Sequence, residues 1–76
     1  NSAMYNHEKE ILKQFGLNVK AERIRQGYSQ ETLAEKIGVA REYISRIERG
    51  VQNMSLVKIT KLANFLETDI TNLLRF

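Results

Sequence analysis

Cysteine, proline and tryptophan are all missing from this 76-residue chain. Without cysteine the chain has neither a disulfide nor a thiolate zinc site, so burial of apolar side chains must supply its stability. No apolar run approaches the roughly 20 residues of a membrane span, and no secretory signal opens the chain. We therefore expect a cytoplasmic protein that makes no contact with a membrane.

Histidine occurs once, at His7, and acidic residues are outnumbered by basic ones. The net charge of +3 suits an anionic partner such as DNA, but many basic proteins have other roles, so the placement of charge must decide. One histidine cannot form a metal site, and the sequence contains no activated nucleophile beside a base, no carboxylate pair and no phosphate-binding glycine loop. We expect no enzyme activity, no metal and no cofactor.

The length of the chain allows one small core and leaves no room for a second domain. Apolar residues make up 42% and charged residues 28% of the chain, which is an ordinary globular balance. The opening "NSAM" looks like a cloning remnant before an initiator methionine. We assign residues 1–4 to this remnant and a disordered start, and residues 5–76 to a single domain.

Apolar residues recur at helical spacing in five segments. They predict helices over residues 5–26, 30–37, about 41–49, about 56–66 and about 69–75. Ser29 and Ser55 are the expected N-caps of the second and fourth helices. No segment alternates with period two, and the second and third helices flank a short turn containing Gly38, which is typical of a helix-turn-helix unit. The predicted fold class is all-α, with five short helices around one core.

The third predicted helix separates apolar from charged residues. At 100° per residue, Ile44 and Ile47 lie on one side with Tyr43. The opposite arc carries Arg41, Glu42, Ser45, Arg46 and Arg49. By itself such an arc usually indicates a solvated face. Because this helix follows a short helix and a glycine turn, we predict that the arc enters the DNA major groove, where Arg41 or Arg46 donates twice to a guanine edge.

Two glutamates of the third helix have distinct expected roles. Glu42 either accepts a hydrogen bond from cytosine N4 or forms an ion pair with Arg46 four residues on, and the sequence does not choose between these. Glu48 lies at the edge of the buried arc, where a carboxylate needs a partner. Arg23 lies on the inward stripe of the first helix, so we predict an Arg23–Glu48 ion pair that joins the two helices.

The chain resembles the helix-turn-helix family of phage Cro and repressor proteins, also called the xenobiotic-response-element family. The resemblance is carried by Arg23, "YSQETLAEKIGV" (28–39), "ISRIERG" (44–50) and "SLVKITKLANFL" (55–66). Within this family, "REYISRIERGVQNMSL" is similar to the controller proteins of restriction-modification systems. The resemblance implies a lambda-repressor-like fold and a sequence-specific transcriptional regulator of bacterial or phage type.

The resemblance also implies roles for single residues. The base-reading positions are Arg41, Glu42 and Arg46, to which the exposed arc adds Ser45. The implied phosphate contacts are Gln30, Tyr43, Arg49, Gln52 and Asn53. For Tyr43, packing of the ring is an equal alternative. The chain departs from the family pattern at Ala40, where a capping residue is usual, at Met54, which replaces a proline, and at Glu67, which replaces a glycine.

One domain of this size contacts too few bases for tight specific binding, so we expect a homodimer on a palindromic operator in double-stranded DNA, without a small-molecule ligand. The expected dimer interface is the apolar C-terminus, comprising Ile70, Leu73, Leu74 and Phe76, with core packing as the alternative for Ile70 and Leu73. A second, weaker candidate surface is the stripe of Leu17, Ala21 and Ile24. The alternative function is an antitoxin or adaptor that uses the same fold to bind protein.

Overall fold

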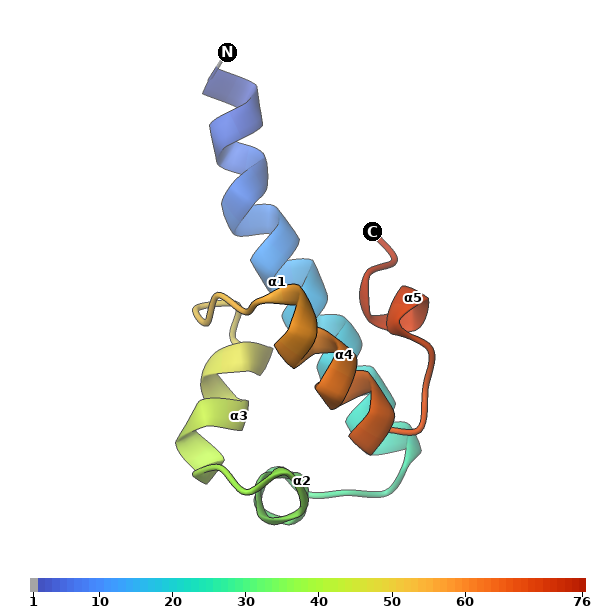
Figure 1. Ribbon diagram of the computed structural model, residues 1–76. Helices are drawn as coiled ribbons and strands as arrows, with labels where there is room; N and C mark the ends of the chain where they lie inside the picture. The colour runs from blue at the N-terminus through green and yellow to red at the C-terminus, as the bar shows by residue number, and fades with distance from the viewer. Residues whose placement is uncertain (1) are drawn as a thin grey trace.

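A computed structural model describes the backbone of residues 2–76 and the side chains of residues 7–76. The chain forms five helices in the order α1 (Ser2–Arg25), α2 (Gln30–Ile37), α3 (Arg41–Glu48), α4 (Leu56–Phe65) and α5 (Ile70–Leu73) (Figure 1). Residues 2–76 contain no strand. These helices confirm the predicted all-α fold with five helices. No helix in the described part of the chain is long and apolar enough to cross a membrane.

Most helix boundaries agree with the sequence prediction, and the two ends of the chain differ. Helix α1 begins at Ser2 rather than at residue 5. Asn1 lies outside the described residues, and the assignment of residues 1–4 to a cloning remnant stays a prediction. Helix α5 has four residues where seven were predicted. Beyond it, the side-chain amide of Asn18 donates to the carbonyl oxygens of Leu73 and Arg75, at 3.0 and 2.8 Å, and holds the chain against α1 in a non-helical conformation.

Helix α2 is capped at both ends, and a short turn joins it to α3. Ser29 Oγ accepts a hydrogen bond from the backbone N–H of Thr32 at 3.0 Å. Gly38 ends the helix in the left-handed conformation, with φ of 86°, which glycine adopts without a Cβ penalty. Ala40 provides no side-chain cap for α3, as its departure from the family pattern predicted. Gly38 therefore ends α2 and begins the turn to α3, and the two helices pack against each other.

One core joins all five helices. Helix α1 packs against α3 and α5, and α4 packs against α2 and α5. Figure 1 shows α3 and α5 on either side of α1, with α4 crossing in front of it. The buried apolar side chains are Phe15, Val19, Leu33, Ala34, Ile44, Ile47, Ile59, Leu62, Ala63, Leu66 and Leu73. Because α3 contributes only its inner side chains to this core, its outer side remains at the surface.

The core includes Leu73, which was predicted from the sequence to lie in the dimer interface. Its side chain is fully buried inside the single chain, so it is not offered to a second subunit. The assignment of Leu73 to the dimer interface is therefore wrong, and the alternative of core packing holds. Ile70 and Leu74 are half-buried beside the core, and Phe76 is 62% exposed. These three residues remain candidates for an interface.

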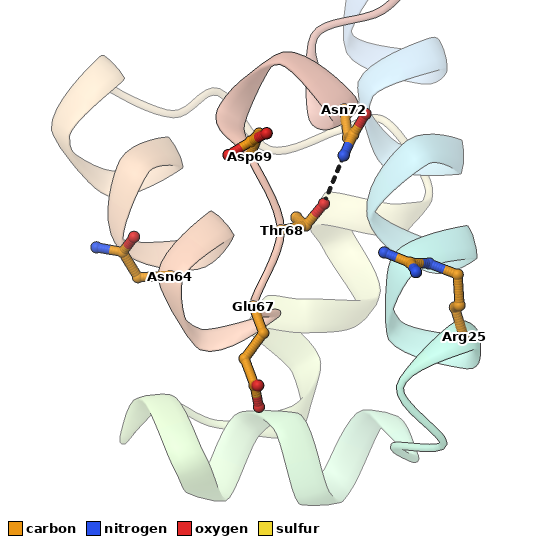
Figure 2. Close-up of a pocket in the computed structure, with 6 residues that line it drawn as sticks. All are labelled: Arg25, Asn64, Glu67, Thr68, Asp69 and Asn72. Carbon is orange, nitrogen blue, oxygen red and sulfur yellow. Dashed lines mark hydrogen bonds between the residues drawn. The ribbon is translucent and has the colours of Figure 1, made fainter.

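Glu67 connects α4 to α5 in a conformation that suits glycine. Its φ of 53° is the only positive φ of a non-glycine residue in the described part of the chain. Figure 2 shows Glu67 at the end of α4 with its side chain extended toward α2. A left-handed conformation costs an L-residue with a Cβ roughly 1–2 kcal/mol. This cost arises at the position where the family pattern has glycine.

We expect Glu67→Gly to raise the free energy of unfolding by about 0.5–1 kcal/mol, because removal of the strain exceeds the greater backbone entropy of glycine in the unfolded chain. The melting temperature should rise by about 4–8 °C for each kcal/mol, and circular dichroism on heating measures it. Glu35→Gly, at an exposed position inside α2, is the control and should lower it. A Glu67→Gly variant that melts below the parent protein would contradict this account.

Candidate nucleic-acid interface

Helix α3 presents two different sides. Ile44 and Ile47 are buried in the core. The opposite side exposes Arg41, Glu42, Arg46 and Arg49, and Ser45 is half-buried beside them. This division confirms the geometry predicted from the 100° spacing. Figure 1 shows α3 at the edge of the molecule, directly after α2, where no other helix covers its outer side.

A buried ion pair joins α3 to α1. Arg23 Nε lies 2.6 Å from Glu48 Oε2, and Arg23 Nη2 donates to Glu48 Oε1 at 3.1 Å. The remaining terminal nitrogen, Nη1, donates to the carbonyl oxygen of Tyr28 at 2.7 Å. The two side chains are 11% and 3% exposed, and no buried side-chain N or O atom of the described residues lacks a partner. The predicted Arg23–Glu48 pair is confirmed. Its bidentate geometry holds the C-terminal end of α3 against α1.

Gln30 connects this buried pair to the exposed side of α3. Its Nε2 donates to Glu48 Oε1 at 3.0 Å, and its Oε1 accepts from Arg41 Nη1 at 2.9 Å. Gln30 was predicted to contact a phosphate. In this structure both its amide nitrogen and its amide oxygen are hydrogen-bonded to other side chains of the protein. The side chain of Arg41 is thereby held by a chain of hydrogen bonds that begins in the core. Sequence reasoning missed this role because Gln30 lies 18 residues from Glu48 and shares no periodic pattern with it.

The two other arginines on this side are also held by neighbours. Arg49 Nη2 lies 2.9 Å from Glu42 Oε2, in an ion pair with both side chains more than half exposed. Arg46 Nε donates to Gln52 Oε1 at 3.2 Å. The ion pair with Arg46, which was one of the two alternatives for Glu42, is therefore not formed. Residues seven apart return to the same face after two helical turns, so Arg49 reaches Glu42 while Arg46 is bonded to the loop after α3.

The other predicted phosphate-contacting residues lie around this arginine side. Tyr43 is half-buried and packs against the core, as the packing alternative required. Gln52 is half-buried and donates to the carbonyl oxygen of Asn53 at 3.0 Å, and Asn53 is exposed. The structure thus brings Gln52 next to Arg46, and leaves the Asn53 side chain at the surface.

A polar depression lies elsewhere, between the C-terminal end of α1 and the connection from α4 to α5. Its volume is about 380 Å³, and it is lined by Arg25, Asn64, Glu67, Thr68, Asp69 and Asn72. In Figure 2 these side chains come from α1, α4, α5 and the connection between α4 and α5, and a hydrogen bond joins Asn72 to Thr68. Arg25 is paired with Glu22 on its own helix. Residues 7–76 contain no group of three or more His, Asp or Glu side chains placed to hold a metal ion.

Two short helices joined by a glycine turn, the second presenting three arginines, define a helix-turn-helix domain. A protein-family model described as "Helix-turn-helix", HTH_3, matches residues 19–73. The chain belongs to this family. The matched residues include helices α2 to α5 and the C-terminal end of α1, residues 19–25.

Known members of the family are similar to this chain over most of its length. The HTH-type transcriptional regulator SinR of Bacillus subtilis is 42% identical over 60 residues, which are 78% of this chain and 54% of SinR. The chain thus spans about half the length of that relative. The structure of the restriction-modification controller protein C.AhdI from Aeromonas hydrophila superposes with a TM-score of 0.75 at 44% identity, covering 82% of this chain and 94% of C.AhdI.

A second solved structure contains DNA. The structure of SinR, master regulator for biofilm formation, in complex with DNA superposes with a TM-score of 0.72 at 41% identity, covering 79% of this chain and 97% of that one. The predicted resemblance to repressor-type and controller-type helix-turn-helix proteins is therefore confirmed.

Proposed function

We propose that this chain is a sequence-specific DNA-binding transcriptional regulator that inserts α3 into the major groove. The observation that carries the proposal is the outer side of α3, where Arg41, Arg46 and Arg49 are all exposed and each is held by a side chain of the protein. The fold of the SinR chain that was solved with DNA supports the same use of this domain. In cells such a regulator acts in the cytoplasm, where bacterial DNA lies.

Arg41 and Arg46 are the proposed base readers. A guanidinium group donates two parallel hydrogen bonds to O6 and N7 of guanine, a contact worth about 1–3 kcal/mol of discrimination. Gln30 acts on Arg41 as a positioning residue, because its amide links Arg41 to the buried Arg23–Glu48 pair. Holding a long side chain in place before binding reduces the entropy that binding costs. Ser45, half-buried between the two arginines, adds a hydroxyl group to the same surface.

Glu42 and Arg49 form the third part of the proposed interface. In the free protein their ion pair is exposed, and such pairs contribute little to stability and weaken with salt. On DNA, Arg49 turns to a phosphate and leaves the Glu42 carboxylate to accept from cytosine N4. Tyr43, Gln52 and Asn53 contact the phosphates on either side. Gln30 keeps its bonds to Glu48 and Arg41 and donates its second amide N–H to a phosphate.

Binding by a homodimer completes the proposal. Two copies of α3, one helical turn or roughly 34 Å apart, read the two halves of a palindromic operator. The interface uses the half-buried Ile70 and Leu74 with the exposed Phe76, all of which lie in the C-terminal segment after α4. Bound near a promoter, the dimer blocks or recruits RNA polymerase.

We expect Arg41→Ala to weaken binding to a preferred operator more than to random DNA, by about 1–3 kcal/mol for each lost bidentate contact. Arg49→Ala should weaken both DNAs about equally and reduce the slope of log Kd against log salt by about one for each subunit, because it removes a phosphate contact. Fluorescence anisotropy with labelled duplexes at several salt concentrations measures both effects.

The exposed Lys20→Ala variant on α1 is the matched control, since it removes one positive charge away from α3. An Arg41→Ala variant that loses the same affinity for operator and random DNA would reject direct readout by Arg41. If none of the duplexes binds and the protein copurifies with a protein partner, the antitoxin or adaptor function replaces the regulator.

A further inference from the structure

The apolar core is open to the surface between the helix-turn-helix turn and α4. A depression with a volume of about 310 Å³ lies there. Its apolar lining comprises the buried Ile47 of α3 and Leu62 of α4 and the half-buried Ile37, Val39, Tyr43 and Met54. Small-molecule sites have volumes of roughly 300–1,000 Å³ and mostly apolar walls with a few polar groups. The depression therefore has the size and lining of a site for a small ligand.

Both charged side chains that line this depression are positive. Lys58 and Lys61 line it from α4, three residues apart and therefore on neighbouring turns of one face. Both are exposed, and no carboxylate of residues 7–76 forms a salt bridge with either. Two ammonium groups beside an apolar floor repel cations and attract an anion. The complementary ligand combines an aliphatic chain with one anionic head group.

We propose that this depression binds an aliphatic carboxylate, with the chain against Ile47, Leu62 and Met54 and the carboxylate between Lys58 and Lys61. An aliphatic chain covers the apolar area that the core leaves open, and its burial supplies most of the affinity. The two lysines supply the preference for an acid over an uncharged molecule of the same shape. This assignment departs from the sequence-based expectation that the protein has no small-molecule ligand.

The site lies directly beside the proposed DNA-reading helix. Tyr43 and Ile47 belong to α3, and Val39 belongs to the turn between α2 and α3. A ligand seated between α3 and α4 changes the packing on which the position of α3 depends, and it adds negative charge near the DNA. Occupancy should therefore lower DNA affinity. The effect on DNA affinity rests on the proposed function. Ligand binding itself needs no DNA, so ligand binding and the proposed function can fail separately.

The test titrates octanoate, below its micelle concentration, into ¹⁵N-labelled protein while amide chemical shifts are recorded. We expect saturable shifts confined to the amides around Val39, Tyr43, Met54 and residues 58–62. Uncharged 1-octanol should bind about fivefold more weakly, because each exposed lysine–carboxylate pair contributes modestly. Shifts that do not saturate, or that spread over the whole chain, would overturn the proposal.

The variant Lys58→Ala/Lys61→Ala separates the charge from the apolar floor. It should bind octanoate no more tightly than octanol, with an unchanged melting temperature because both side chains are exposed. The matched control Lys9→Ala/Lys20→Ala removes the same charge from the exposed surface of α1 and should keep the fivefold preference. Equal affinity of the parent protein for octanoate and octanol, or loss of the preference in the control, would contradict a site built around Lys58 and Lys61.

Discussion

Replacement of Glu48 by alanine is expected to lower the melting temperature by about 12–40 °C, which corresponds to about 3–5 kcal/mol in a domain of this size. The loss is large because the Arg23 guanidinium, which donates to both carboxylate oxygens of Glu48, would remain buried without an anion. Gln30 would also lose its acceptor on Glu48. A domain of this size has little stability in reserve, so we expect most of the variant to unfold on modest heating.

Two further variants make this result specific to the buried pair. Glu42→Ala removes a carboxylate from the exposed pair with Arg49 and should change the melting temperature by only a few degrees, since such pairs contribute about 0–1 kcal/mol. Replacing both buried partners, as in Arg23→Met/Glu48→Leu, should restore much of the lost stability because no unpaired charge remains. Thermal unfolding of Glu48→Ala that matches the parent protein would show that the pair does not hold α1 to α3.

Replacement of Gly16 by alanine should lower the free energy of unfolding by about 1–3 kcal/mol, although alanine favours helices over glycine by about 1 kcal/mol. Gly16 lies where α1 crosses the C-terminal end of α3. A Cβ at this position would meet the carbonyl oxygen of Ile47 and lie 2.7 Å from the carbonyl oxygen of Glu48. These are backbone atoms that cannot rotate away, so the two helices must separate. Urea titration followed by circular dichroism measures the change.

The sign of the Gly16→Ala effect decides between two explanations for glycine inside α1. If Gly16 were only a poor helix residue, alanine would raise the stability by about 1 kcal/mol. Lys20→Gly, at an exposed position one turn further along α1, is the control for helix propensity and should cost about 1 kcal/mol. A stabilised Gly16→Ala variant would contradict the close approach of α1 and α3.

Periodicity and burial were sufficient to predict much of the fold and part of the site. The spacing of Ile44 and Ile47 placed the arginines of α3 outward, because a helix repeats every 3.6 residues whatever its partners are. The Arg23–Glu48 pair followed because two opposite charges on inward stripes must meet or remain unpaired. Both inferences start from the side of its own helix on which each residue lies.

Polar contacts at the surface and the position of the C-terminal segment were not predictable in the same way. Arg49 competes successfully with Arg46 for Glu42, and Gln30 bridges Glu48 to Arg41, because of where the loop after α3 and the start of α2 place their polar groups. Leu73 enters the core because Asn18 holds the chain after α5 against α1. Each of these outcomes depends on the relative position of two or more elements, which no single periodic pattern encodes.

A chain of hydrogen bonds connects the buried core to Arg41 on the exposed side of α3. Arg23 orients Glu48, Glu48 accepts from Gln30, and Gln30 accepts from Arg41, so the proposed base reader is connected to the ion pair that joins α1 to α3. Gln30→Ala breaks this connection while it leaves Arg41 itself in place. On this account, the stability of the fold and the orientation of the reading side chain depend on the same carboxylate.

Selection of bound duplexes from a random DNA pool tests the central claim most directly. The account predicts enrichment of a two-fold symmetric sequence whose half-site centres lie about 10 base pairs apart, with guanines at the positions reached by Arg41 or Arg46. The same selection with Arg41→Ala should lose information at those positions and keep the symmetry. A pool that shows no enrichment after repeated rounds, at low as well as moderate salt, would contradict a sequence-specific DNA-binding function for this chain.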